Sequence, residues 1–228
     1  MAARKAVEVY LDLLSQPCRA VQIFLRSTKI PHTVKMVALR KGEHQTPEFA
    51  KLNPMKKVPV MVDNGFVLTE SDAILKYLAN TYNAPEHWYP RQPERRAKVD
   101  EYTAWHHSYT RPHAAKVFIL EVLLPRMTGQ PTEPAKIEKA LVELGDTLEK
   151  LEAMFLKRQP FLCGDDITLA DLLCICELMQ PFGGGRDILQ DHPQLLTWRS
   201  RVQSALKGSF DEAHSVLYRL RDKAKPKL

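Results

Sequence analysis

The sequence contains no continuous apolar stretch long enough to cross a bilayer. Its most apolar segment, LADLLCICELM, is interrupted by Asp171 and Glu177, whereas a membrane-spanning helix needs about 20 apolar residues. The first residues alternate apolar and polar side chains, so they lack the apolar block of a secretory signal. We therefore expect a cytoplasmic protein without a membrane partner.

Potential metal ligands are few and scattered. The 228-residue chain has four cysteines and eight histidines. Cys174 and Cys176 flank one residue, but no second pair follows at zinc-ligand spacing. Without an export signal, the thiols are expected to remain reduced. We predict no metal site. FGGGR, at 182–186, also lacks the lysine and hydroxyl of a phosphate-binding loop.

Basic residues exceed acidic ones, with a net charge of +6 and a pI of about 9.1. Acids and bases alternate along most of the chain, and the basic run without acids is the tail KAKPKL. This pattern argues against a nucleic-acid partner. The positive field favours anionic small molecules instead. The 44% hydrophobic content is typical of a globular protein with one large or two ordinary domains.

The first part of the chain predicts a strand, a helix and a second strand. Residues 7–13 alternate apolar and polar side chains, which is the period of a strand. Pro17 suits the first turn of a following helix, which should stop near Ser27. A second strand fits residues 32–39, followed by a polar loop with a short helical turn.

A hairpin and another helix follow. Asn64-Gly65 joins two β-rich runs and is a preferred pair for a two-residue turn. Thr69 and Asp72 have the spacing of a capping box at the start of a helix. The resulting β-α-β-α-β-β-α order predicts a four-stranded mixed sheet flanked by helices, in an α/β domain over residues 1–82. The proline-rich segment 83–93 is predicted to be a linker.

Residues 94–228 predict an all-α domain. Pro112 should kink the first long helix, and a second long helix fits residues 133–157. Thr168 and Asp171 form a further capping box. Shorter helices are expected near residues 193–206 and 210–222.

The segment SQPC, at the junction of the first strand and helix, poses a functional question. Strand, C-x-x-C and helix is the order of a thioredoxin-like redox site, but Ser15 stands at the first cysteine position. Three readings follow from the residues. Cys18 could act alone as a redox thiol, Ser15 could cap the helix, or the reacting thiol could come from a substrate.

Several longer motifs favour the third reading. The segments YLDLLSQPCRAV, KKVPVM, LTESDAILKYL, VDEYTAW and ITLADL occur in this order and resemble those of cytosolic glutathione transferases, in particular the theta class. The resemblance implies a thioredoxin-like N-terminal domain and an all-helical C-terminal domain that contributes the electrophile pocket. It also implies an enzyme that activates the glutathione thiol to attack small electrophiles, with glutathione as co-substrate and no resident cofactor.

The resemblance makes Ser15 the catalytic residue. A free thiol has a pKa of about 8.5, and a hydrogen bond from the Ser15 hydroxyl to the thiolate would lower it. The positive end of the helix near Pro17 would act in the same sense. Arg111 matches a position that faces the sulfur, although it could instead bind carbonyls freed at the Pro112 kink. Cys18 matches a structural position.

The resemblance also implies the glutathione-binding residues. His44 and Lys57 match positions near the glycine carboxylate, and the backbone of Val58, before a cis proline, would pair with the cysteinyl segment. Glu70 and Ser71 match the pair that holds the γ-glutamyl end. The alternatives are solvated loop residues for His44 and Lys57 and a helix cap for the TES segment.

The family further implies a homodimer and a detoxification role. Theta-class chains commonly continue into a helix that covers the site, whereas this sequence ends at Leu228, so we expect a more open site. The sequence does not identify the electrophile. Two other functions remain open: a glutathione-binding or protein-interaction module without useful turnover, and a thiol-disulfide enzyme that uses Cys18.

Overall fold

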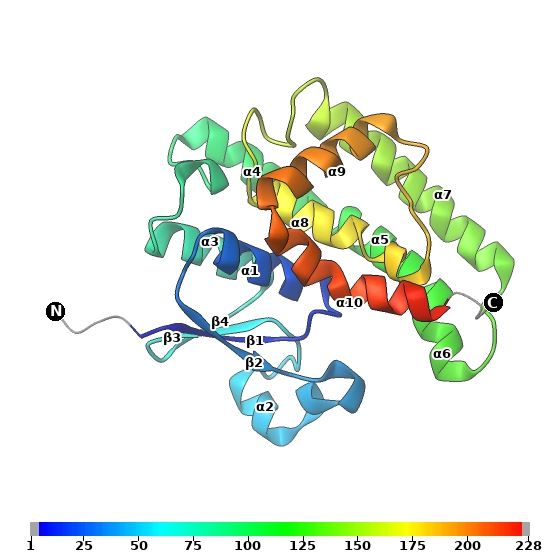
Figure 1. Ribbon diagram of the computed structural model, residues 1–228, viewed down its shortest axis with the longest axis horizontal. Helices are drawn as coiled ribbons and strands as arrows, with labels where there is room; N and C mark the ends of the chain where they lie inside the picture. Colours follow the sequence, from blue (N-terminus) through cyan, green and yellow to red (C-terminus); the bar gives the residue numbers. More distant parts are fainter. Residues whose placement is uncertain (1–4, 225–228) are drawn as a thin grey trace.

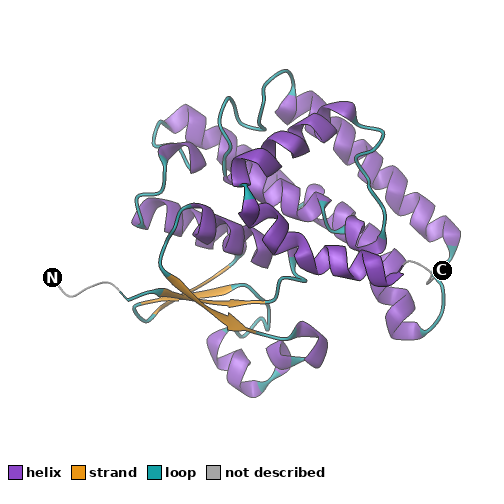
Figure 2. Ribbon diagram, in the orientation of Figure 1, coloured by secondary structure: helices purple, strands orange, loops and turns teal. Residues whose placement is uncertain are grey.

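The computed structural model describes residues 5–224, and Figure 1 shows their arrangement. Residues 225–228, which form most of the predicted basic tail, lie outside the described residues. A small sheet with its helices is followed by a larger, helical part (Figure 2). The predicted fold class, a thioredoxin-like domain followed by an all-α domain, is confirmed.

The strands form a mixed sheet in the order β2-β1-β3-β4. They are β1 (Val7–Leu11), β2 (His32–Met36), β3 (Val60–Asp63) and β4 (Phe66–Thr69). β1 and β2 are parallel, whereas β3 is antiparallel to both β1 and β4. The alternation predicted for the first strand is real, because Val7, Val9 and Leu11 are buried while the residues between them are partly exposed.

Helices cover both faces of this sheet. Figure 1 shows α1 and α3 between the sheet and the helical part, and α2 on the opposite face. The helices and short 3-10 turns of this domain are α1 (Gln16–Ser27), η1 (Leu39–Lys41), η2 (Glu43–Gln45), α2 (Pro47–Leu52) and α3 (Ser71–Thr81). The loop with a short helical turn after the second strand is therefore confirmed.

The hairpin prediction is confirmed, but the capping box that followed it is wrong. Asn64 and Gly65 both have positive φ, at 50° and 86°, as the tight turn requires. Thr69, however, is still in β4, and α3 is preceded by Glu70, which has a φ of 65°. The carboxylate of Asp72 instead accepts a hydrogen bond from Lys76 Nζ at 2.8 Å.

The rest of the described chain is helical. Its elements include two π-helical stretches, η4 and η5, and run in this order: η3 (Glu86–Trp88), α4 (Pro93–His106), α5 (Thr110–Phe118), η4 (Ile119–Leu123), α6 (Leu124–Thr128), α7 (Pro134–Lys150), η5 (Leu151–Leu156), α8 (Leu169–Leu178), η6 (Pro181–Gly184), α9 (Pro193–Leu206) and α10 (Gly208–Ala224). Over residues 5–224, none of the helices is long and apolar enough to cross a membrane.

The predicted kink at Pro112 is wrong in its position. The helix breaks earlier, between His106 and Thr110, and Pro112 lies in the first turn of α5. A first-turn proline costs no helical hydrogen bond, because its missing N–H would have had no partner there. The proline therefore fixes where a new helix starts rather than bending an old one.

The capping box at α8 is confirmed. The Thr168 side chain accepts from Ala170 N at 3.2 Å, and Asp171 Oδ2 accepts from Thr168 N at 2.9 Å. Asp171 is fully buried and its Oδ1 also accepts from Leu162 N and from Trp198 Nε1, both at 2.8 Å. One carboxylate thus joins the start of α8 to the preceding loop and to α9.

Helix α1 is enclosed on both sides. Every residue from Pro17 to Leu25 is buried, so this helix has no solvent-exposed face over these nine residues. The sheet covers one side of α1, and α8 and α10 of the helical part cover the other (Figure 1). The start of this helix, with Ser15, therefore lies where the two domains meet.

Candidate active site

Ser15 occupies the N-cap position of α1. Its N–H donates to the carbonyl of Asp12 at 2.9 Å, and its side chain is partly exposed. Among the described residues, no backbone N–H donates to the Ser15 hydroxyl as in a helix cap. The hydroxyl is thus placed at the positive end of a 12-residue helix without being used to cap it.

A cavity of about 790 Å³ opens beside Ser15. This volume suits a small molecule. Polar groups come from Ser15, Gln16, Arg40, Arg126 and Gln180. The rest of the lining is apolar and comes from both domains: Leu14, Leu39, Ala115, Phe118, Ile119, Leu123, Met127 and Leu220. The arrangement can accept an apolar compound next to a hydroxyl.

A smaller cavity adjoins the first turn of α1 and gathers most of the predicted binding residues. Its lining consists of Pro17, Asn53, Lys57, Val58, Pro59, Glu70, Ser71 and Arg111. Helices α1 and α5 contribute to both cavities, since Gln16 and Ala115 line the larger one while Pro17 and Arg111 line the smaller one. The two cavities are therefore neighbours along the same pair of helices.

The segment before β3 and the start of α3 form the walls of the smaller cavity. The Val58–Pro59 peptide bond is cis. Asn53, which the sequence did not single out, donates from Nδ2 to the Lys57 carbonyl at 2.8 Å and so shapes this segment. Ser71 is buried at the N-terminus of α3, and Glu70 before it is exposed. Backbone N–H groups at such a terminus can bind an anion.

His44 does not join this group. It lies on η2, and it is absent from the described lining of both cavities. Lys57 is exposed, which is compatible with the alternative that it is a solvated loop residue. The predicted roles of His44 and Lys57 at a carboxylate stay predictions.

Arg111 lines the smaller cavity and contacts a buried acid. Its Nε lies 4.0 Å from Glu177 Oε1 on α8, and His106 Nε2 lies 3.9 Å from the same oxygen. Burial raises the pKa of Glu177 to about 7, although Arg111 and Arg19 act to lower it. Burial lowers the pKa of His106 to about 3. Arg111 is thus placed with Glu70 and Ser71 rather than in the cavity beside Ser15.

Cys18 is poorly suited to act as a nucleophile. It is fully buried, and burial raises the pKa of its thiol to about 12 despite a hydrogen bond with the Ser15 side chain that acts to lower it. A reactive cysteine needs an accessible thiolate. The geometry therefore disfavours a redox reaction at Cys18.

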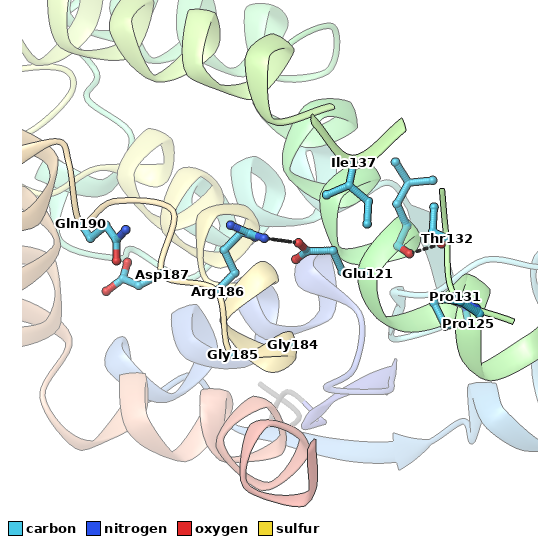
Figure 3. Close-up of a pocket in the computed structure, with 11 residues that line it drawn as sticks. Glu121, Pro125, Pro131, Thr132, Ile137, Gly184, Gly185, Arg186, Asp187 and Gln190 are labelled. Atoms are coloured by element: carbon cyan, nitrogen blue, oxygen red, sulfur yellow. Dashed lines mark hydrogen bonds and ion pairs between the residues drawn. The ribbon is translucent and has the colours of Figure 1, made fainter. Parts of the chain in front are cut away.

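A third cavity, of about 640 Å³, contains none of the predicted site residues (Figure 3). Arg186 on its wall donates from Nε to Glu121 Oε1 at 2.7 Å, and Asp187 pairs with Arg199 at 2.9 Å. Gly184 of the FGGGR segment is needed for packing, because a Cβ there would lie 2.7 Å from the Val122 side chain. Within residues 5–224 no cluster of three or more potential metal ligands occurs.

Comparisons with known proteins decide the family. The model of the glutathione S-transferase N-terminal domain matches residues 9–80, and that of the C-terminal domain matches residues 115–205. The chain belongs to the glutathione S-transferase family. It is 47% identical to mouse glutathione S-transferase theta-1, over 95% of this chain and 90% of the relative. Human theta-1 is 46% identical over the same shares, and human theta-2 is 40% identical over 97% and 91%. These relatives confirm the predicted theta class.

Solved glutathione S-transferases have the same fold. Human T1-1 in its apo form matches with a TM-score of 0.92 at 45% identity, covering 95% of this chain and 91% of that one. Human theta-2, in complex with glutathione and an unknown ligand, matches with a TM-score of 0.92 at 40% identity, covering 96% and 90%. The fold over about 95% of the chain is therefore that of the theta-class structures.

Three residues of this glutathione S-transferase site escaped the sequence analysis: Arg19, Gln180 and Glu177. Each is buried and each belongs to α1 or to α8 and the turn that follows it. In the sequence, Glu177 is recognisable only as a charge that interrupts an apolar run. The sequence holds one signal for Glu177: it is a charged residue inside an otherwise apolar helix. A charged side chain is rarely buried without a partner, so this position indicates a buried, partnered acid.

Proposed function

We propose that this protein conjugates glutathione to small, largely apolar electrophiles, with Ser15 as the group that stabilises the thiolate. The observation that supports the proposal is the position of Ser15 on the wall of the larger cavity, two residues before Pro17, which lines the smaller cavity. The smaller one offers a backbone edge, a helix N-terminus and charged side chains, as an extended anionic peptide requires. The larger one is mostly apolar and takes the second substrate.

The chemistry follows from the Ser15 hydroxyl and the start of α1. The hydroxyl donates a hydrogen bond to the glutathione sulfur, and the positive end of the helix favours the same negative charge. The thiol proton passes to solvent. The thiolate then forms a carbon–sulfur bond as the leaving group, for example a halide, departs with its bonding electrons.

The residues of the smaller cavity would hold the tripeptide. Glu70 accepts from the γ-glutamyl ammonium, the N-terminus of α3 at Ser71 binds the γ-glutamyl carboxylate, and the Val58 backbone pairs with the cysteinyl segment. Arg111 adds positive charge to the same cavity. Lys57 and His44 are assigned to the glycine carboxylate from the family resemblance; Lys57 lines the smaller cavity, whereas His44 is not among the described lining residues of either cavity.

The test is the conjugation rate of Ser15→Ala with a panel of alkyl and aryl halides at saturating glutathione. Loss of a hydrogen bond to a charged group predicts a decrease of about ten- to a hundredfold. Cys18→Ala is the matched control, because it removes the neighbouring thiol and should leave the rate of folded protein unchanged. The proposal fails if the wild type conjugates none of the halides, or if only Cys18→Ala is inactive.

A binding module without turnover is the second candidate. It predicts that calorimetry detects glutathione binding while no halide is conjugated, and that Ser15→Ala changes neither result.

We also propose that two chains pair as a homodimer. Phe66 and Val67, on the edge strand β4, are 48% and 42% exposed, and exposed apolar residues on a strand edge favour an interface.

A further inference from the structure

Arg19 is a fully buried arginine that forms no direct ion pair, although the charge of Glu177 on α8 acts to raise its pKa against the effect of burial. Its exposed fraction is 0%, and no acidic side chain among residues 5–224 lies within ion-pair distance of it. Burying a guanidinium is costly unless its donors find acceptors. The acceptors that Arg19 binds therefore indicate its role.

Arg19 binds two carbonyls directly before Ser15. Its Nη1 donates to the Leu13 carbonyl at 2.8 Å, with a longer contact to the Leu14 carbonyl at 3.4 Å. Asp12 holds the same loop, because its carboxylate accepts from Leu14 N at 2.9 Å. The backbone that carries the Ser15 hydroxyl is thus fixed by hydrogen bonds to the side chains of Arg19 and Asp12.

The other end of the guanidinium reaches the helical domain. Nη2 donates to the Cys176 carbonyl at 2.8 Å and to Gln180 Oε1 at 2.5 Å. Gln180 in turn donates from Nε2 to the Leu14 carbonyl at 3.3 Å. Gln180 is 2% exposed and lines the cavity beside Ser15. Arg19, Gln180 and the Leu14 carbonyl therefore close a ring of hydrogen bonds across the domain boundary.

We propose that Arg19 and Gln180 are positioning residues that hold Ser15 in register with the helical wall of the electrophile cavity. This inference rests on the proposed function of Ser15. The pair fixes the loop before Ser15 to the end of α8, so the donor hydroxyl and the second substrate keep a constant separation. A misplacement of about 1 Å can cost a large factor in rate.

The test uses Gln180→Leu, which removes both hydrogen bonds of the glutamine at similar volume. The pKa of the bound glutathione thiol is measured from thiolate absorbance in the binary complex, together with kcat and KM against pH. We expect a thiol pKa about one unit higher, a decrease of about tenfold in kcat near pH 6.5, and a KM for glutathione within about twofold of the wild type. The decrease should shrink at pH above the shifted pKa.

Arg19→Lys removes the planar fork. A lysine has one ammonium group and cannot bind both domains in this way, so we expect it to behave like Gln180→Leu. Arg26→Met is the matched control. It breaks the exposed ion pair between Arg26, near the other end of α1, and Glu212 of α10, and it should leave the thiol pKa unchanged.

Two further results decide the inference. In a Ser15→Ala background, Gln180→Leu should cause no additional loss, because both changes act through the same hydroxyl. Additive losses, or a Gln180→Leu variant with wild-type thiol pKa and kcat, would overturn the positioning role while leaving the function of Ser15 intact. Full activity of Ser15→Ala would instead refute the proposed function itself.

Discussion

Arg111 Nε lies 4.0 Å from Glu177 Oε1, and the side chain of Glu177 is 2% exposed. The acid lies on α8, behind the cavity wall to which Arg111 contributes from α5. The positive groups around it are Arg111, Arg19 from α1, and His106 from α4 if protonated. The charge near Arg111, a partly exposed residue of the candidate site, thus depends on whether the buried Glu177 is ionised.

Glu177 should make the stability of the protein fall as pH rises. Burial raises its folded-state pKa from 4.5 to about 7, so the folded state binds a proton that the unfolded chain has already lost. The associated stability is present below about pH 4.5 and is lost as pH rises through 7. His106 and His214, with pKa values lowered to about 3, have the opposite effect as pH falls below 6.5.

The comparison with Glu177→Gln isolates the glutamate from the histidines. Between pH 5 and pH 8, the wild type should lose about 2 to 3 kcal/mol more unfolding free energy than the variant. Urea unfolding at several pH values measures the difference. Parallel curves for the two proteins would show that Glu177 titrates as an ordinary acid.

Arg111→Ala should raise the KM for glutathione by about ten- to a hundredfold, as expected for a lost charged contact. The reason is that Arg111 shares its cavity with Glu70 and Ser71. Arg126→Ala serves as the control, because Arg126 lines the cavity beside Ser15 and should leave that KM unchanged. A loss confined to kcat would instead support the sequence-based prediction that Arg111 faces the sulfur.

Asp171→Ala should lower the free energy of unfolding by at least about 3 kcal/mol. The buried carboxylate accepts hydrogen bonds from Leu162 N, Thr168 N and Trp198 Nε1, and each bond to a charged group contributes about 1.5 to 3 kcal/mol. Thr168→Ala removes the cap of α8 and one hydrogen bond to Asp171, while the three other donors to Asp171 remain, and it should cost about 1 kcal/mol. Urea titration followed by tryptophan fluorescence compares them. Equal losses would contradict a role for Asp171 beyond capping.

Phe66→Asp should convert the proposed homodimer to a monomer. Phe66 packs against Tyr77, with ring centroids 5.2 Å apart, and an aspartate at this edge would place a charge inside a self-associating surface. Sedimentation velocity measures the change in mass. Met154→Asp, at an equally exposed methionine on η5 (49% exposed), is the control. A wild-type monomer, or two dimeric variants, would refute the assignment of this surface.

Local signals in the sequence predicted the elements that depend on few neighbours. The alternation in β1, the Asn64-Gly65 turn and the box formed by Thr168 and Asp171 are each set within a few residues. The kink predicted at Pro112 was wrong because a proline is compatible with both a kinked helix and the start of a new helix. The local sequence does not distinguish these two structures, and the arrangement of α4 and α5 does. The family resemblance supplied the rest of the fold.

The layer behind the site could not be read from the sequence in the same way. Arg19 and Cys176 are 157 positions apart in the sequence. Their contact exists because α8, from the second domain, packs against α1, and no pattern within the first domain indicates this packing. Glu177 was hidden for the same reason, because its partners come from α4 and α5. Such contacts are set by the angle between helices rather than by any local pattern.

The enclosure of α1 has a consequence for folding. Because one helix supplies the core of both domains, neither hydrophobic core is complete without the other. Heating should then produce one calorimetric transition rather than two, and residues 1–82 expressed alone should not reach the native structure. Cells would have to complete synthesis of α10 before the sheet domain becomes resistant to proteases, although the sheet is made first.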